Sequence, residues 1–249
     1  MAKKVGLVLL LGPIFPAQLV LAACTDTPQM RVNWSECEKA GIDLSNADLR
    51  QAVLTNINLE KANLARARLE QADMGFANLH SARLDGIRAR ELRLVGANLN
   101  NARLDGGRLT EARLDRANLE GATLKKTRLN KAQMYNTVFI NAIAIEADLS
   151  EAIMEQSNLS GADFSKTNFH MAHLNYAILE QAKFIDADFS KAKLKNADLT
   201  DADFSGANLE GADLSNTDLT GAIFKNAKLG NAIWSDRKRC RPGSIGVCR

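Results

Sequence analysis

Residues 207–216, with the sequence ANLEGADLSN, show the pattern that decides the fold. They contain two copies of a five-residue unit: alanine, a polar residue, leucine and two further polar residues. Every fifth residue from Leu44 to Trp234 is apolar, and leucine fills 26 of these 39 central positions. The position two residues earlier is alanine in 29 of the 39 units. The unit runs from Ile42 to Asp236 without an insertion, so the repeat governs the architecture.

The five-residue period excludes an amphipathic helix. Five residues advance a helix by about 140° beyond a full turn, so the leucines would spiral around it. Alanine and leucine are two residues apart, and this strand-like alternation points both side chains to one side. The two polar residues that follow favour a bend. Short extended pieces joined by regular bends predict a coil with alanine and leucine inside, and successive coils must stack to bury that side.

The size of the coil follows from residues that recur at intervals of 20. The central phenylalanines Phe164, Phe184, Phe204 and Phe224 have this spacing, and we expect them to form one ladder in the core. Twenty residues are four units, which predicts a four-sided coil. About ten coils spaced by about 4.8 Å predict a rod about 47 Å long. Trp34 and Trp234 flank the repeat, and we expect them to cover the open ends of the core.

The run at residues 207–216 resembles the pentapeptide-repeat family, and the resemblance covers 195 of the 249 residues. It implies an all-β fold, a right-handed quadrilateral β-helix of about ten coils with the central residue of each unit pointing inward. The family has no common catalytic residues. The ends of the chain are similar to those of exported members. The expected organisation is a signal peptide at 1–23, an N-terminal cap at 24–41, the β-helix at 42–236 and a C-terminal cap at 237–249.

Export is predicted by residues 1–23, which carry two lysines, an apolar run and small residues at the end, as is typical of a secretory signal peptide. Two prolines interrupt the apolar run and disfavour the alternative of a transmembrane helix. We therefore expect a periplasmic or secreted protein.

All four cysteines lie near the ends of the chain, at Cys24, Cys37, Cys240 and Cys248. An even number of cysteines in an exported chain indicates disulfides, and we predict the local pairs Cys24–Cys37 and Cys240–Cys248. The alternative is that residues 21–24 form the lipobox of a bacterial lipoprotein. Lipid on Cys24 would then anchor the chain to a membrane and leave Cys37 unpaired.

The sequence contains no pattern specific to catalysis. The three histidines are scattered, and no phosphate-binding glycine motif precedes a helix. His170 and His173 fall in outward positions of adjacent units, but no cysteine lies near them in the sequence. We predict a non-enzymatic protein without a metal ion or another cofactor.

The net charge of the chain is +3, but the charge is distributed unevenly along the rod. Residues 66–131 carry a net charge of +6, whereas residues 132–236 carry −8. In the basic part, four arginines at the 20-residue spacing predict one stripe: Arg68, Arg88, Arg108 and Arg128. Guanidinium groups pair well with phosphate and carboxylate, so the stripe is a candidate polyanion-binding face. The alternative is a solvated face that keeps rods from stacking end to end.

An apolar group of outward residues lies where the charge changes sign: Val138, Ile140, Ile143 and Ile145. An exposed group of this kind often marks a partner site, so it is our candidate interaction patch. The alternative is a local bulge that turns Ile143 inward beside the small central residue Ala144.

These features support three hypotheses about function. The first is a rigid interaction rod of the bacterial envelope, whose partner is another envelope protein. The second is a polyanion-binding module that uses the arginine stripe. The third is the DNA mimicry of quinolone-resistance members that protect topoisomerases, which the resemblance allows. The signal peptide and the basic half disfavour this third role, and no nucleic acid is expected as a partner.

Overall fold

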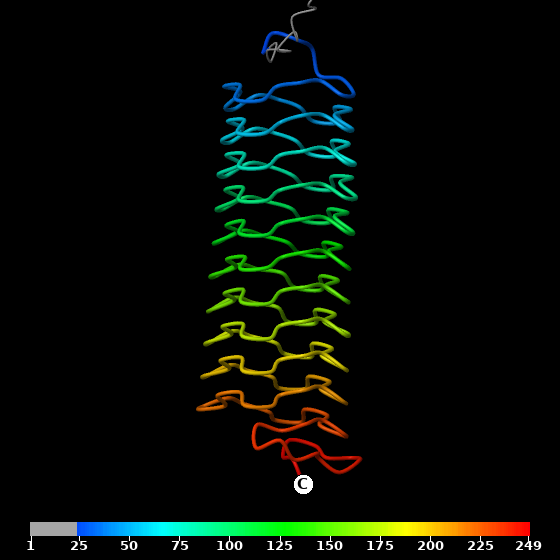
Figure 1. The fold of residues 1–249 in the computed structure, drawn as a ribbon, viewed down its shortest axis with the longest axis vertical. Helices are drawn as coiled ribbons and strands as arrows, with labels where there is room; N and C mark the ends of the chain where they lie inside the picture. Colours follow the sequence, from blue (N-terminus) through cyan, green and yellow to red (C-terminus); the bar gives the residue numbers. More distant parts are fainter. Residues whose placement is uncertain (1–23) are drawn as a thin grey trace, which may run out of the picture.

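A computed structural model describes residues 24–249, so the predicted signal peptide lies outside the described residues. Figure 1 shows the chain winding in similar coils that stack along the long axis, from the blue N-terminal end to the red C-terminal end. In the described part, no residue is helical, and the β-structure consists of single bridge residues separated by turns. Accordingly, residues 24–249 include no helix long and apolar enough to cross a membrane.

The bridges define the register of the stack. Every parallel bridge joins residues 20 positions apart, from Asn33–Val53 to Asp213–Ile233. Twenty residues are four units, which is the period that the phenylalanine and arginine spacings predict. The bridge residue is the polar one between alanine and leucine. Bridges already form at Asn33 and Glu38, so the coil geometry begins ahead of Ile42 and includes much of the expected N-terminal cap.

The bends between the extended pieces are tight turns. In the first complete unit, the Ala47 N–H donates to the Leu44 carbonyl at 3.0 Å, and Asn46 has a φ of 61°. A positive φ at the third residue of a four-residue turn corresponds to type II geometry. A positive φ recurs at every fifth residue from Arg31 to Asn231. From Arg31 to Asn216, the N–H of each such residue donates to a carbonyl of the next coil, as Asn46 shows with the Ala65 carbonyl at 2.9 Å.

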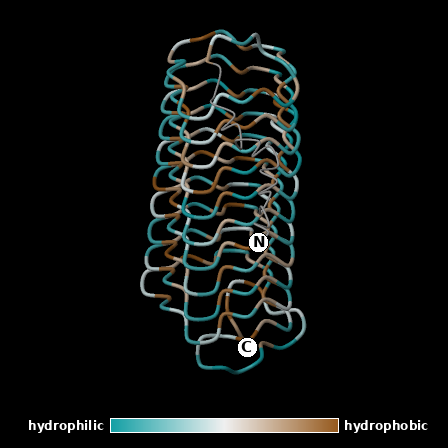
Figure 2. Ribbon diagram, turned by 45° about the horizontal axis from the view of Figure 1, so that its top comes forward, coloured by the Kyte–Doolittle hydropathy of each residue, from teal (hydrophilic) through white to brown (hydrophobic). Residues whose placement is uncertain are grey.

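The core is a continuous column of the central residues and the alanines that precede them, and nearly all of them are fully buried. Figure 2 shows brown and teal segments in every coil, as the alternation of inward and outward residues requires. Phe164, Phe184, Phe204 and Phe224 stack in order, with ring centroids 5.9, 4.9 and 5.3 Å apart. The rings are nearly parallel, because the register places equivalent residues directly above one another.

The core also adjusts its volume between coils. Ala89 is a small central residue, and the preceding inward residue, Ile87, is large. In the next coil, Gly107 replaces the usual alanine, and a Cβ atom built there would lie 3.4 Å from Ile87 Cγ1. Ile87 therefore replaces the usual alanine in its own coil, and Gly107 leaves room for the larger side chain in the next coil.

Disulfides close both ends of the rod, and both predicted pairs are confirmed: Cys24–Cys37 and Cys240–Cys248. No cysteine in residues 24–249 remains free. At the N-terminal end, Trp34 is fully buried. Lys39 Nζ lies 4.2 Å from the centre of the Trp34 ring and donates to the Cys24 carbonyl at 2.7 Å. The disulfide-bonded segment is thereby fixed to the first coil.

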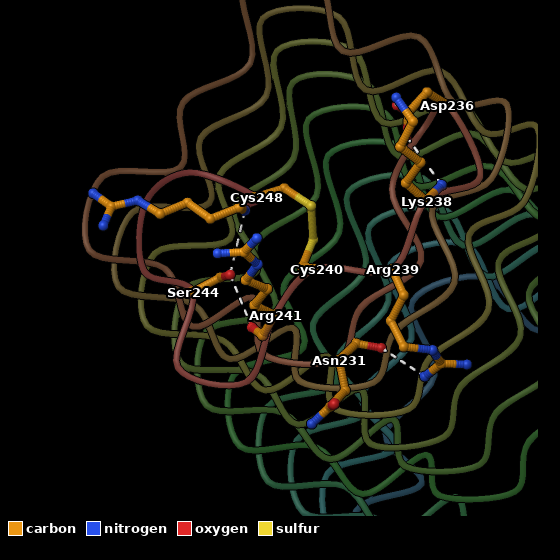
Figure 3. The surroundings of a disulfide bond; sticks show 9 residues. Asn231, Asp236, Lys238, Arg239, Cys240, Arg241, Ser244 and Cys248 are labelled. Carbon is orange, nitrogen blue, oxygen red and sulfur yellow. Dashed lines mark hydrogen bonds and ion pairs between the residues drawn. A yellow bond between two sulfur atoms is a disulfide. The ribbon is translucent and has the colours of Figure 1, made fainter.

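At the C-terminal end, the tail turns back over the last coil (Figure 3). Two antiparallel bridges hold it, Ile233–Arg239 and Lys228–Ile245. The Arg239 guanidinium donates to the Asn231 carbonyl at 3.1 Å. Trp234 is only partly buried and meets the last phenylalanine of the ladder edge to face, at 5.1 Å. The tail thus pairs with backbone groups that a free end would expose.

Candidate functional site

The four stripe arginines lie next to one another in successive coils. Bridges join Arg68 to Arg88, Arg88 to Arg108 and Arg108 to Arg128. Asp48 precedes them in the same ladder, and Asp148 follows them. The guanidinium groups therefore extend from consecutive levels of one face, which we call the arginine face. Its bridge residues, in order along the rod, are Asp48, Arg68, Arg88, Arg108, Arg128, Asp148, Asn168, Asp188, Asn208 and Lys228.

The stripe arginines differ in their ion pairing from the arginines on the neighbouring faces. Each neighbouring arginine has a carboxylate oxygen within 4.0 Å, and the four pairs are Arg83–Asp85, Arg93–Asp73, Arg103–Asp85 and Arg113–Asp115. Across residues 24–249, no carboxylate lies within that distance of Arg88, Arg108 or Arg128, and all three are exposed. Their positive charge is therefore available to an external anion.

A surface cavity of about 500 Å³ lies beside the stripe. Glycine occupies the corner in two successive coils, at Gly86 and Gly106, and the missing side chains leave this space open. A second cavity, of about 550 Å³, shares Arg88 and Arg108 and also contains Glu70 and Glu111. The first cavity contains no carboxylate, and its lining residues are Asn46, Arg66, Arg68, Gly86, Arg88, Gly106 and Arg108.

The N-terminal end of the arginine face is neutralised within the chain. Arg50 donates to both oxygens of Asp48, at 2.8 and 2.6 Å, and these hydrogen bonds lower the pKa of the Asp48 carboxyl below its ordinary value. Arg68 Nη1 lies 3.7 Å from the same carboxylate. Asp48 therefore stays ionised near neutral pH and partly balances Arg68. The uncompensated positive charge is concentrated in the next three arginines.

The residues of the candidate interaction patch lie on two adjacent faces. Val138 and Ile143 occupy bridge positions of neighbouring ladders, and Ile140 and Ile145 follow them at the corners. All four side chains are partly buried. Bridges join Ile143 to Thr123 and Asp163 in the regular register. The alternative of a bulge that turns Ile143 inward is therefore wrong, because Ile143 keeps the outward position of its ladder.

More strongly exposed apolar residues lie within the next two coils of the rod, and the sequence reasoning missed them. Ile153, Met171 and Tyr176 are 39, 45 and 59% exposed. Met171 and Tyr176 occupy the left-handed corner position, with φ values of 56° and 60°. Polar residues and glycine are the rule at that position, so an apolar residue in the fifth place of a unit was the signal that could have found Met171 and Tyr176.

The structure brings together no cluster suited to metal chemistry in the described part of the chain. No group of three or more histidine, cysteine or acidic side chains in residues 24–249 could hold a metal ion. His170 Nδ1 lies 2.8 Å from Ser190 Oγ in the next coil, so its local partner is a hydroxyl group.

Comparison with protein families gives a match to pentapeptide repeats in eight copies. The matched residues are 42–80, 72–110, 93–131, 108–139, 132–170, 167–201 and 197–233. No curated protein sequence matches the chain.

Two solved structures are similar over most of the chain. HetL from the cyanobacterium Nostoc sp. strain PCC 7120, a pentapeptide repeat protein involved in heterocyst differentiation regulation, is 33% identical. That match covers 84% of this chain and 92% of HetL, with a TM-score of 0.46. QnrB1, a plasmid-mediated fluoroquinolone resistance protein, is 18% identical, with 82% and 91% of the two chains covered and a TM-score of 0.44.

A third structure, from the Arabidopsis thaliana thylakoid lumen, is 28% identical. The match covers 45% of this chain and 71% of that protein, with a TM-score of 0.23. The family match spans nearly the whole repeat, and the 20-residue bridge register gives it a structural basis. The chain is a member of the pentapeptide-repeat family, whose β-helical solenoids generally act as non-enzymatic scaffolds for protein interactions.

Proposed function

We propose that this protein is an exported, non-catalytic interaction rod of the bacterial envelope, which presents fixed ladders of side chains to another envelope protein. The observation that carries the proposal is the unbroken register of parallel bridges from Asn33 to Ile233, closed by a disulfide at each end. A stack of this kind holds outward side chains at constant spacing. Disulfides are typical of an oxidising compartment such as the periplasm, which agrees with the expected signal peptide.

The proposal includes a right-handed quadrilateral coil of about ten turns. The four-unit register and the family membership support this geometry. At about 4.8 Å per coil, the rod is about 47 Å long. A surface of this length allows recognition by a series of side chains at fixed levels.

The test of the proposal is capture of partners from envelope extract on the immobilised mature rod. We assign the contact to the candidate interaction patch and expect Ile140→Lys combined with Ile145→Lys to abolish capture while the thermal unfolding midpoint changes little. Ile223→Lys is the matched control, because Ile223 is an exposed isoleucine in the same ladder as Ile143. Equal capture by wild type and the double variant would refute the patch. Absence of any envelope partner would refute the interaction function.

A second candidate function is binding of a polyanion by the arginine face. It is favoured by the absence, within residues 24–249, of any carboxylate oxygen within 4.0 Å of Arg88, Arg108 or Arg128, and by the arginine-lined cavity beside them. Wild-type protein should then bind an immobilised polyanion such as heparin, and 1 M salt should release it. DNA mimicry is disfavoured, because a mimic needs broadly negative faces and this rod carries a stripe of arginines.

A further inference from the structure

The charges of the arginine face have an order that an antiparallel second copy of the same face matches. Starting from the N-terminal end, the bridge residues are one aspartate, four arginines, two alternating pairs of aspartate and asparagine, and one lysine. The sign changes between Arg128 and Asp148, at the middle of the ladder. When a second copy lies antiparallel to the first, the acidic half of one copy lies opposite the basic half of the other.

We propose that the arginine face is a homodimer interface, on which two rods pair antiparallel about a two-fold axis between the levels of Arg128 and Asp148. The proposal rests on the proposed function, because it assumes that the rod acts through its side-chain ladders. A two-fold axis makes each contact occur twice. Three opposite-charge pairs then form across the interface: Arg128 with Asp148, Arg88 with Asp188, and Asp48 with Lys228. The remaining two levels place Arg108 and Arg68 opposite Asn168 and Asn208.

Four of the groups that would pair, Arg88, Arg128, Asp148 and Asp188, have no ionic partner within residues 24–249, whereas Asp48 is already paired with Arg50. Asp148 accepts hydrogen bonds from Ser150 and Asn168 through Oδ1 alone. Asp188 likewise uses Oδ1, with Ser190 N–H and Asn208 Nδ2 as the donors. In residues 24–249, no lysine or arginine nitrogen lies within 4.0 Å of either carboxylate. Each aspartate thus keeps its second oxygen available, opposite an arginine that also lacks a carboxylate.

The corner residues beside the ladder fit the same arrangement, since this two-fold axis brings each row of corners against itself. Lys126 lies opposite Glu146, with which it already forms an ion pair at 3.6 Å within its own chain, and Gly86 lies opposite Asp186. Gly106 lies opposite Lys166, and Arg66 lies opposite Gly206. The glycines that open the arginine-lined cavity therefore make room for the longer side chains of the other copy. On the opposite edge, one like-charged pair forms near the ends of the interface, Glu70 opposite Glu210. Arg68 lies 3.8 Å from Glu70 in the same chain and partly balances its charge.

The neighbouring faces do not have this complementarity, which makes the order on the arginine face specific. On the following face, the same arrangement would oppose Arg93 with Lys193 and Asp73 with Asp213. On the preceding face, Arg83 would oppose Lys183, and the one opposite-charge pair would be Arg103 with Asp163. Like charges directly opposite one another disfavour an interface and exclude the wrong register.

The experiment is sedimentation of the disulfide-intact mature protein over a range of concentrations, in 0.05 and 1 M salt. We expect a dimer that dissociates at high salt, because screening shortens the range of these charges to about 3 Å. Arg88→Glu and Asp188→Arg should each raise the dimer dissociation constant by about tenfold or more, since each places like charges opposite one another twice. Combining both changes in one chain exchanges the two charges and should restore the dimer. Lys193→Glu, on the following face, is the matched control and should leave association unchanged.

Asp188→Arg also separates self-pairing from polyanion binding, because it weakens the dimer but adds positive charge for a polyanion such as heparin. A dimer that Asp188→Arg leaves intact, or that the charge exchange does not restore, would overturn the proposal. So would a monomer at every concentration in 0.05 M salt. None of these results would affect the envelope-partner function, which the capture experiment with the isoleucine variants tests separately. Circular dichroism and the unfolding midpoint verify that each variant folds.

Discussion

At the residue scale, the fold depends on one conformation repeated at every corner. Residues with a positive φ recur at every fifth position from Arg31 to Asn231, and most of them are not glycine. An L-residue in this conformation costs roughly 1 kcal/mol, so the chain tolerates many small penalties. The regular hydrogen bonds of each coil and the buried alanine–leucine column offset them. The unit length is therefore fixed by the turn as well as by the core.

Adjacent glycines distinguish a backbone cost from a packing cost. Gly106 has a φ of +68°, and a Cβ atom built there meets nothing within 4 Å, so Gly106→Ala should lower the free energy of unfolding by only about 1 kcal/mol. Gly107 points inward, and its Cβ would lie 2.9 Å from Leu109 Cδ1 and 3.0 Å from the Leu104 carbonyl oxygen. Gly107→Ala should therefore cost about 1–3 kcal/mol through overpacking. Chemical denaturation of both variants measures the difference, and a smaller cost at Gly107 would contradict this packing.

At the element scale, each coil is held by the coils on either side of it, and the phenylalanine ladder shows this dependence most clearly. Phe184 is fully buried and lies 5.9 Å from Phe164 and 4.9 Å from Phe204, measured between ring centroids. Phe169 and Phe189 meet it edge to face, at 5.8 and 5.0 Å. Removing one ring therefore leaves a cavity that several neighbours border.

Phe184→Ala should lower the free energy of unfolding by about 3–5 kcal/mol, as other buried phenylalanine truncations do. The control is Lys195→Ala, because Lys195 is an exposed corner residue and its truncation should cost less than about 0.5 kcal/mol. Urea unfolding of the two variants makes the comparison. Similar losses at the two positions would be incompatible with the inward and outward assignments.

The caps are the second feature at this scale, because an open coil exposes backbone groups that the next coil would pair. In the C-terminal cap, Leu229 N–H donates to the Ser244 carbonyl and Cys240 N–H donates to the Ala232 carbonyl, both at 2.8 Å. Cys240→Ser combined with Cys248→Ser removes the covalent closure of this tail and should cost about 2–3 kcal/mol.

Hydrogen exchange localises this effect. We expect amides of the last coil, including Leu229 and Asn231, to exchange faster in the double serine variant, while amides near Leu109 keep their protection. Uniform loss of protection along the rod would mean that the cap does not act locally.

The bridge register also makes a prediction at this scale. Ile143 lies in an outward ladder between Thr123 and Asp163, so Ile143→Lys should leave the unfolding midpoint and the circular dichroism spectrum nearly unchanged. Local unfolding of this variant would restore the bulge hypothesis.

At the scale of the whole molecule, the repeat made the solenoid and the 20-residue register predictable from sequence, and the even number of cysteines near the chain ends made both disulfides predictable. Apolar residues recur at every fifth position from Leu44 to Trp234, and few folds permit this spacing. The arginine stripe was also identifiable, since Arg68 and Arg88 have the spacing of the coil. The lack of ion pairs in the stripe could not be predicted, because the ion pairs of the neighbouring Arg83 and Arg93 with carboxylates depend on side-chain geometry. The extension of coil geometry to Asn33 was missed, since a lysine, Lys39, occupies a central position there.

The central claim is that this rod matures outside the cytoplasm with both ends closed. The most direct measurement is the intact mass of the unreduced protein recovered from separated cell fractions. We predict an envelope or secreted chain that begins close to Cys24 and lacks the hydrogens lost in two disulfides. A diacylglycerol adduct on Cys24 with a free Cys37 would contradict the N-terminal closure. A cytoplasmic chain that retains residues 1–23 and four free thiols would contradict the account as a whole.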